Sequence, residues 1–359
     1  MIPMGPDAGK VLLGNGSDEQ ASTLGYYQQL GKMFLGEFRY SSELYDPATN
    51  TLARQSTRTL RDVAQTATVL TSGPRSGWIL LAAPDTTDLY DSFTHTVVAG
   101  PHSPHVFNYS TATMIPSGPN SGKILFAGGA HDPPNSTDLY DPVTNTFTPG
   151  PAMNIGRYGH IAGLIATGPN AGKILLVGGW SPGDSEHSVA LASTELYDSE
   201  TNSFAPPGDT ASMKTARAFH TATTIPTGPN AGKILIAGGE TNDFHKLSST
   251  ELYDPTSNSF SPGPQMKAQR AQHAAITIAS GAHAGKILIA GGAACHFKTE
   301  IACGKVEAST EFYDPATNTF APGPLMYGAP GDVVAVQLPS SPPPRSGTGV
   351  KSHVPTRHQ

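Results

Sequence analysis

The sequence predicts an all-β fold built from repeated four-stranded units, and three observations support this prediction. One short segment recurs through the 359 residues. Its strong copies are SGKILFAGGA at 121–130, AGKILLVGGW at 171–180, AGKILIAGGE at 231–240 and AGKILIAGGA at 284–293, with weaker copies at 8–16 and 76–83. Spacings of about 45 to 60 residues are typical of propeller blades or solenoid turns. The 39 glycines and 32 prolines suit many short strands joined by tight turns.

The repeat that begins at residue 219 shows the elements of one unit in order. Residues 219–226 (FHTATTIP) alternate small, β-branched and apolar side chains, which predicts the first strand. A Gly- and Pro-containing loop follows, and residues 233–237 are predicted to form the second strand. That strand is apolar on both faces, so we expect it to be covered on both sides by neighbouring sheets. The Gly-Gly doublet at 238–239 is expected to end it where another sheet approaches closely.

The second half of the unit is predicted to be a hairpin. Residues 249–253 read as the third strand and residues 259–260 as the fourth. Asp254-Pro255 and Asn258 supply turn chemistry between them, since Asp accepts from nearby backbone N–H groups and Asn tolerates the left-handed region. The same Tyr-Asp block recurs at Tyr45, Tyr90, Tyr140, Tyr197 and Tyr313.

These features together resemble the kelch repeat, which has four antiparallel strands, a glycine doublet after the second, a Tyr ending the third and an aromatic residue on the fourth. The resemblance covers residues 1 to about 339, and it is degraded in the first two repeats, where Gly14-Asn15-Gly16 and Ala82-Ala83 replace the doublet. Kelch repeats usually carry Trp on the fourth strand; Phe147, Phe204, Phe260 and Phe320 stand there instead. The resemblance implies a β-propeller of twisted sheets around a central channel.

We expect six blades in a closed ring. The repeated tyrosines mark six third strands, and the sixth first strand is found only at residues 331–338, so we expect it to pair with the N-terminal blade. The insertion at 17–41, with a rival second strand at 31–36, leaves seven blades or a degenerate first blade as the alternative. The propeller is assigned to residues 1–339, and the Pro- and Ser-rich residues 340–359 are expected to be a flexible tail.

Candidate ligand-binding residues lie on one face of the ring, because the loops joining strands two to three and one blade to the next vary in sequence. On this face the spacing Met-x3-Arg-x2-His recurs. Its candidate residues are Arg157, Arg217 and Arg270 with His160, His220 and His273. In kelch adaptor domains that bind acidic peptides, arginines at this place can line the pocket, so the resemblance implies a similar role. Repetition in three blades favours the alternative, which is structural hydrogen bonding.

Composition excludes several kinds of partner and cofactor. The net charge is −6 and the 22 Lys and Arg are scattered, so we expect no nucleic-acid partner. The longest apolar runs are about six to eight residues, too short for a membrane helix. The polar loop residues His131, Asp132, Asp184, His187, Asp243 and His245 lack zinc-site spacing, so we expect no metal and no cofactor. We expect a monomer.

Two cysteines and the N-terminus bear on the compartment. Cys295 and Cys303 lie eight residues apart in one loop, which predicts a local disulfide and an oxidising compartment, with free thiols as the alternative. Residues 1–10 show no signal peptide, but they match the interior segment 225–233. We therefore expect a chain that begins within a repeat, as in an N-terminally truncated protein. The compartment stays open, with an extracytoplasmic one favoured by the cysteine pair.

Three functional classes fit the sequence. The favoured class is a module that binds a protein, peptide or glycan ligand at the variable face. The second is an enzyme similar to the sialic acid mutarotases, which would need a Glu and an Arg facing the channel; Glu240 with Arg217 or Arg270 is the nearest set. The third is a structural module of a longer secreted protein. Galactose oxidase-like enzymes share kelch blades, but their copper ligands have no match here, so an enzyme is not the favoured interpretation.

Overall fold

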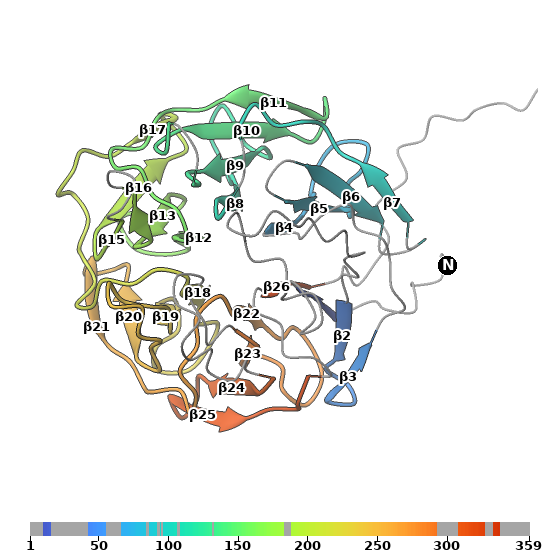
Figure 1. Cartoon of the computed structure of the whole chain (residues 1–359), viewed down its shortest axis with the longest axis vertical. Helices are drawn as coiled ribbons and strands as arrows, with labels where there is room; N and C mark the ends of the chain where they lie inside the picture. Colours follow the sequence, from blue (N-terminus) through green and yellow to red (C-terminus); the bar gives the residue numbers. More distant parts are fainter. Residues whose placement is uncertain are drawn as a thin grey trace, which may run out of the picture.

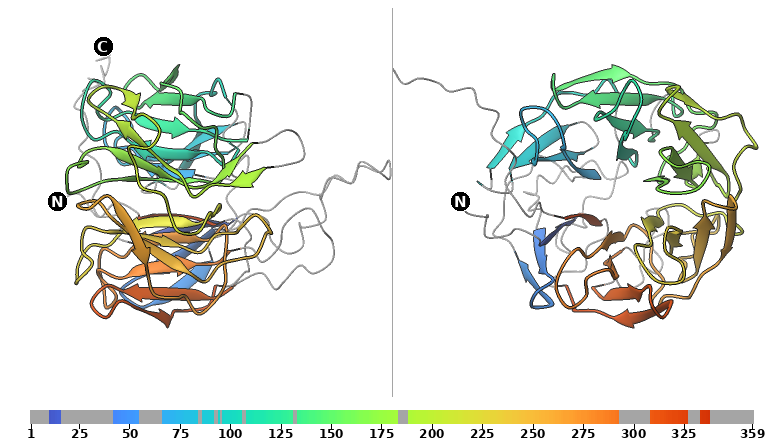
Figure 2. Two further views of the ribbon diagram at one scale, coloured as in Figure 1. Left: turned by 90° about the vertical axis from the view of Figure 1, so that its left-hand side faces the viewer. Right: turned by 180° about the vertical axis from the view of Figure 1, so that it is seen from behind.

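The computed structural model describes residues 10–15, 42–54, 66–83, 86–91, 94, 96–105, 108–130, 133–182, 188–292, 308–326 and 333–337. Their strands form an all-β propeller, in which twisted sheets follow one another around a central axis (Figure 1). Figure 2 shows the same ring of sheets from the side and from behind. The predicted all-β propeller fold is therefore confirmed.

Six four-stranded antiparallel sheets make up the ring in the described residues. From channel to rim, the first holds β26 (Val333–Gln337), β1 (Val11–Asn15), β2 (Ser42–Asp46) and β3 (Thr51–Arg54). The second holds β4 (Thr66–Val69), β5 (Ile79–Ala82), β6 (Thr87–Asp91) and β7 (Thr96–Ala99), and the third β8 (Thr111–Met114), β9 (Ile124–Ala127), β10 (Thr137–Asp141) and β11 (Thr146–Pro149). The fourth holds β12 (Ile161–Leu164), β13 (Ile174–Val177), β16 (Thr194–Asp198) and β17 (Ser203–Phe204). The fifth holds β18 (Thr221–Thr224), β19 (Ile234–Ala237), β20 (Thr250–Asp254) and β21 (Ser259–Pro262), and the sixth β22 (Ala274–Thr277), β23 (Ile287–Ala290), β24 (Thr310–Asp314) and β25 (Thr319–Pro322).

The ring closes through strands from both ends of the propeller. Strand β26 pairs antiparallel with β1, and the register places Val336 opposite Leu12. The innermost strands form an unbroken circle of neighbours in the order β4, β8, β12, β18, β22, β26 and back to β4. Figure 1 shows β26 on the channel side, between β22 and β4. The pairing predicted for residues 331–338 is thus observed over Val333–Gln337.

The second strands β5, β9, β13, β19 and β23 are buried at every position, as their uniformly apolar sequences predict. In β19, Ile234 and Ile236 pack against the fourth sheet, while Leu235 and Ala237 pack against the sixth. All four side chains are buried. Burial on both faces explains why the ILIA-type segment recurs with so little variation.

The hairpin turn between the third and fourth strands has the predicted chemistry. The Tyr253 hydroxyl donates to Oδ1 of Asn258, and Asn258 has a positive φ of 48°. The backbone N–H of Thr256 donates to Asp254. Across the hairpin Tyr253 pairs with Phe260, and their ring centroids are 5.0 Å apart. The Tyr-to-Asn bond recurs in four other sheets, at Tyr45–Asn50, Tyr140–Asn145, Tyr197–Asn202 and Tyr313–Asn318.

The face that carries these turns is used for contacts between sheets. Gly228, in the loop after the first strand of the fifth sheet, has φ +76°, and a Cβ on it would lie 2.2 Å from the Pro315 carbonyl oxygen of the next sheet. Gly281 meets the Pro47 carbonyl oxygen in the same way, which ties the sixth sheet to the first. The repeated sequence of this face therefore reflects packing, and the opposite face is left for variable loops.

Some expectations fall beyond what the structure describes, and one element was not predicted. The insertion at 17–41 with its rival strand, the Cys295 and Cys303 loop and the tail at 340–359 lie outside the described residues. The unpredicted element is the hairpin of β14 (Trp180–Ser181) and β15 (Val189–Ala190), which is inserted between β13 and β16 on the variable face.

Candidate functional site

The repeated arginines lie in the loops that lead into β12, β18 and β22, and their side chains are fully buried. In the fifth sheet, Nη1 of Arg217 donates to the carbonyl oxygens of Gly238 (2.8 Å) and Ser249 (3.1 Å). Nη2 of Arg217 forms an ion pair with Glu251 at 3.0 Å. Arg157 with Glu195 and Arg270 with Glu311 repeat this arrangement. Each arginine thus fastens the end of the second strand to the start of the third within its own sheet.

The carboxylates that face these arginines are saturated with donors. Glu251 accepts from the backbone N–H groups of Lys214 and Thr215 in addition to Arg217. Burial lowers the pKa of Arg217, while the charge of Glu251 opposes that shift. Because the guanidinium groups are 0% exposed, they do not line a binding surface. The geometry therefore favours structural hydrogen bonding over ligand binding for Arg157, Arg217 and Arg270.

The same segments fit closely against the glycine doublet of the preceding sheet. The second glycine, Gly239, donates its N–H to the Arg270 carbonyl oxygen at 2.9 Å. Gly238 has φ +63°, and a Cβ there would lie 2.5 Å from that oxygen and 2.8 Å from the His273 ring. The doublet therefore marks the close approach of a neighbouring sheet, as its sequence predicts.

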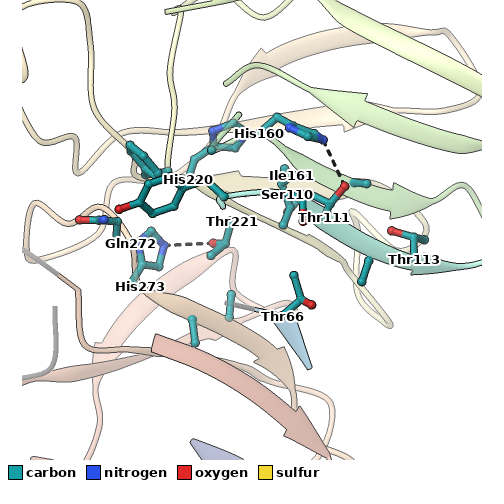
Figure 3. A pocket seen from close by; sticks show the side chains of 18 of the residues that line it. Thr66, Ser110, Thr111, Thr113, His160, Ile161, His220, Thr221, Gln272 and His273 are labelled. Carbon is teal, nitrogen blue, oxygen red and sulfur yellow. Dashed lines mark hydrogen bonds between the residues drawn. The ribbon is translucent and has the colours of Figure 1, made fainter. Parts of the chain in front are cut away.

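A pocket of about 260 Å³ occupies the mouth of the channel on the variable face. Its wall comes from the start of five innermost strands, β4, β8, β12, β18 and β22, and from the residues just before four of them. The second position of each strand is alanine, at Ala67, Ala112, Ala162, Ala222 and Ala275. Figure 3 shows the lining side chains pointing into this space from several sheets. Small residues on the wall leave room for a ligand of sugar or amino-acid size.

One position of the repeat gives the pocket its individual character. It directly precedes the histidine in the fourth, fifth and sixth sheets and Ser110 in the third. It is occupied by Tyr109, Gly159, Phe219 and Gln272, all with φ between 54° and 59°. Their backbones form a chain around the mouth, since Gly159 donates to Tyr109, Phe219 to Gly159 and Gln272 to Phe219 at 2.7–2.8 Å. The Phe219 ring lies over Gly159 and meets the Tyr109 ring edge-on, with centroids 4.9 Å apart. The sequence contains a signal for this position, because its residue type differs between repeats whose neighbouring residues are similar.

The three predicted histidines line the pocket but are almost entirely buried. Nε2 of His160 is 3.1 Å from the Thr111 hydroxyl, and Nε2 of His273 is 3.0 Å from the Thr221 hydroxyl (Figure 3). The corresponding neighbour of His220 is Ile161, which has no hydroxyl. Neither ring nitrogen of His220 makes a hydrogen bond of ordinary distance and angle with the described residues, and only the Val177 carbonyl lies close enough to act on the ring.

Burial keeps all three imidazoles neutral. Burial, together with the smaller effect of the nearby charge of Arg217, lowers the pKa of His220 to about 3, while the Val177 carbonyl acts in the opposite direction. Burial and the nearby arginine likewise hold the pKa values of His160 and His273 well below the usual range. The histidines therefore contribute no positive charge to the pocket at neutral pH.

Giving His220 the partner that its two counterparts have is expected to stabilise the fold. The matched substitutions are Ile161→Thr and Ile161→Val, which differ by one hydroxyl in place of a methyl group. We expect Ile161→Thr to be the more stable by about 1 kcal/mol, because its hydroxyl can bond to Nε2 of His220. Urea unfolding of both variants at pH 7.5 measures the difference. Equal stability, or a more stable valine variant, would contradict the assignment of residue 161 as the missing partner.

Glu240, the remaining ligand-binding candidate, is not among the described residues that line the pocket. Glu240 is 2% exposed and forms an ion pair with Lys246, and its backbone bridges to Ala218. The predicted set of Glu240 with Arg217 or Arg270 is not observed as an ion pair. Arg217 instead pairs with Glu251, and Arg270 pairs with Glu311.

The other polar loop residues give no metal centre in the described part of the chain. Asp243 and His245 are described, whereas His131, Asp132, Asp184 and His187 are not, and no described group of three His, Cys, Asp or Glu side chains is placed to hold a metal. No helix among the described residues has the length and apolar character needed to cross a membrane.

Comparison with known proteins supports the fold alone. No family model matches the sequence, and no curated protein matches it. Among solved structures, the one titled "Structure of YjhT" is similar, with a TM-score of 0.55 and 14% sequence identity. The match covers 76% of this chain and 87% of that chain. A likeness at this identity speaks only to the arrangement of strands, and it supports the β-propeller fold.

Proposed function

We propose that this chain is a six-bladed, kelch-type propeller that binds a small organic ligand at the mouth of its central channel. The observation that carries the proposal is the pocket itself, where a framework repeated in the third to sixth sheets presents four different residues, Tyr109, Gly159, Phe219 and Gln272. Concave sites with aromatic side chains and a few polar groups are typical of small-molecule binding. The repeated strands, glycine doublets and Tyr-Asp turns support the kelch-type assignment.

Backbone strain at the mouth favours a binding role. Glycine adopts the left-handed region freely, as Gly159 does, but large side chains adopt it against their preference. Tyr109, Phe219 and Gln272 nevertheless occupy it. Strained conformations of this kind concentrate at ligand sites, where the surrounding structure holds them in place.

The proposal is tested by screening a library of neutral, acidic, basic and aromatic small molecules by ligand-observed NMR. We expect hits that Gln272→Trp weakens at least about tenfold, because the indole fills the pocket mouth. The matched control is Val143→Trp, an exposed position in a turn on the opposite face, which should leave binding unchanged. Melting temperatures check that both variants are folded. Hits that are insensitive to Gln272→Trp, or no hits at all, would refute this site.

Macromolecular partners can be sought with the same proteins. A glycan array and a pull-down with wild type and Gln272→Trp would detect a glycan, peptide or protein that inserts a side group into the pocket. The extracytoplasmic location favoured by Cys295 and Cys303 stays a prediction, and a thiol assay on the purified protein would test the disulfide.

A further inference from the structure

The described side chains that line the pocket carry no formal charge at neutral pH. They are small or apolar residues, hydroxyl-bearing Ser and Thr, the aromatic Tyr109 and Phe219, the amide of Gln272 and three histidines. Burial holds the histidines neutral. The described guanidinium groups on this face, Arg157, Arg217 and Arg270, are fully buried and bound to carboxylates. Among the described lining residues, a charged ligand would therefore find no partner of opposite charge to offset the loss of its hydration.

The aromatic side chains give the pocket an apolar side. Phe219 and Tyr109 line the pocket, are partly exposed, and meet edge-on with their ring centroids 4.9 Å apart. The aromatic surface continues outward, since Tyr109 contacts Tyr158, with centroids 6.4 Å apart. Beyond it, Trp180 contacts Phe244, which is 39% exposed. Rings of this kind bind ligands through a large contact area that includes C–H groups.

Hydrogen-bonding groups also line the pocket, and Gln272 follows Phe219 around its mouth. Gln272 offers an amide oxygen and an amide NH2, and Thr66 and Thr113 come from neighbouring innermost strands (Figure 3). An amide or hydroxyl can both donate and accept, which suits a ligand whose own groups are hydroxyls. The described lining of the pocket therefore combines aromatic rings with hydrogen-bonding groups and carries no formal charge.

We infer that the ligand is an uncharged sugar ring, with one C–H face packed on Phe219 and its hydroxyls toward Gln272 and the threonines. This inference rests on the proposed function and specifies the ligand class of that site. A neutral pyranose has the required shape, because its axial C–H groups make one face apolar while its hydroxyls project from the edge. The ring is either a free monosaccharide or the terminal residue of a glycan, in which case the next residues lie over Tyr158 toward Phe244.

The inference is tested with methyl glycosides of galactose, glucose, mannose and N-acetylglucosamine, each neutral hexose paired with its uronic acid. In saturation-transfer NMR we expect at least one neutral glycoside to bind, with the strongest saturation on the C–H protons of one ring face. Its uronic acid should bind at least about tenfold more weakly. A matching di- or trisaccharide that binds more tightly than the monosaccharide identifies a glycan end as the source; equal affinity identifies a free sugar.

Two variants at one position isolate the aromatic contact. Phe219→Leu keeps apolar volume but removes the ring, and it should weaken binding about three- to tenfold. Phe219→Tyr keeps the ring and should bind like the wild type. Equal binding by wild type and Phe219→Leu, or tighter binding of the uronic acid, would overturn the inference. If the broader library yields Gln272-dependent ligands but no sugar binds, the ligand class is wrong while the proposed site stands.

Discussion

Replacing Arg217 with alanine is expected to lower the free energy of unfolding by roughly 3–5 kcal/mol, because it leaves Glu251 buried without its charged partner. The substitution also removes donors to the carbonyl oxygens of Gly238 and Ser249. Urea unfolding of the purified variant at neutral pH measures the loss. A drop of this size would identify the arginines as part of the framework, since a surface ligand contact would leave the melting temperature within a few degrees.

A double-mutant cycle separates the ion pair from the volume of the side chains. In this cycle, Arg217→Met and Glu251→Gln are made singly and together. Each single change should be strongly destabilising, whereas the double variant should be less destabilised than the sum of the two, because no uncompensated charge remains. Val143→Ala, at an exposed turn, serves as a neutral control. Additive losses would mean that Arg217 and Glu251 do not act as a pair.

The stability of this protein is expected to fall at acidic pH by more than the protonation of its carboxylates alone would cause, because three buried histidines add to the loss. His160, His220 and His273 are neutral in the folded state, and their folded pKa values lie far below the unfolded value of about 6.5. Above pH 6.5 these histidines do not lower the free energy of unfolding, because they are neutral in both the folded and the unfolded chain. Below it the unfolded chain binds protons that the folded chain does not, so stability falls as the pH decreases toward the folded pKa, which is about 3 for His220. Each histidine contributes a slope of up to about 1.4 kcal/mol per pH unit.

The contribution of one histidine can be measured by difference. Urea unfolding of wild type and His220→Gln between pH 7.5 and 5 should give parallel curves above pH 6.5 and diverging curves below it. The variant should lose less stability per pH unit, by up to about 1.4 kcal/mol, because glutamine does not titrate. Identical slopes would show that His220 is protonated in the folded protein or exposed to solvent.

Much of the fold could be predicted from the sequence because the repeats act as independent copies of one pattern. A strand such as Ile234–Ala237 is apolar at every position, and a strand with that pattern needs cover on both faces. The Asp-Pro turns and the glycine doublets have requirements that only a few residue types meet. The pairing of β26 with β1 followed from counting, since one first strand was missing from its own repeat.

The candidate site was harder to predict, because the direction of a side chain depends on contacts between sheets. The Met-x3-Arg-x2-His segment correctly marked the variable face, but its spacing does not tell whether Arg217 turns toward the channel or toward Glu251. The residue just before each histidine lines the pocket instead. Its left-handed backbone conformation could not be predicted from the residue types Phe and Gln, which rarely adopt it. Hairpin β14–β15 was missed because its two strands are only two residues long.

The pairing of β26 with β1 also has a consequence for synthesis on the ribosome. Residues 11–15 emerge early, but their partner at 333–337 is translated after all the other described strands. Until then one edge of β1 has no partner from its own chain, and an unprotected edge can recruit a strand from another nascent copy. Joining such distant segments adds little entropic penalty, since each doubling of length costs only about 0.6 kcal/mol. The vulnerable interval is therefore set by how long translation takes, and slow or stalled ribosomes should favour strand-exchanged dimers.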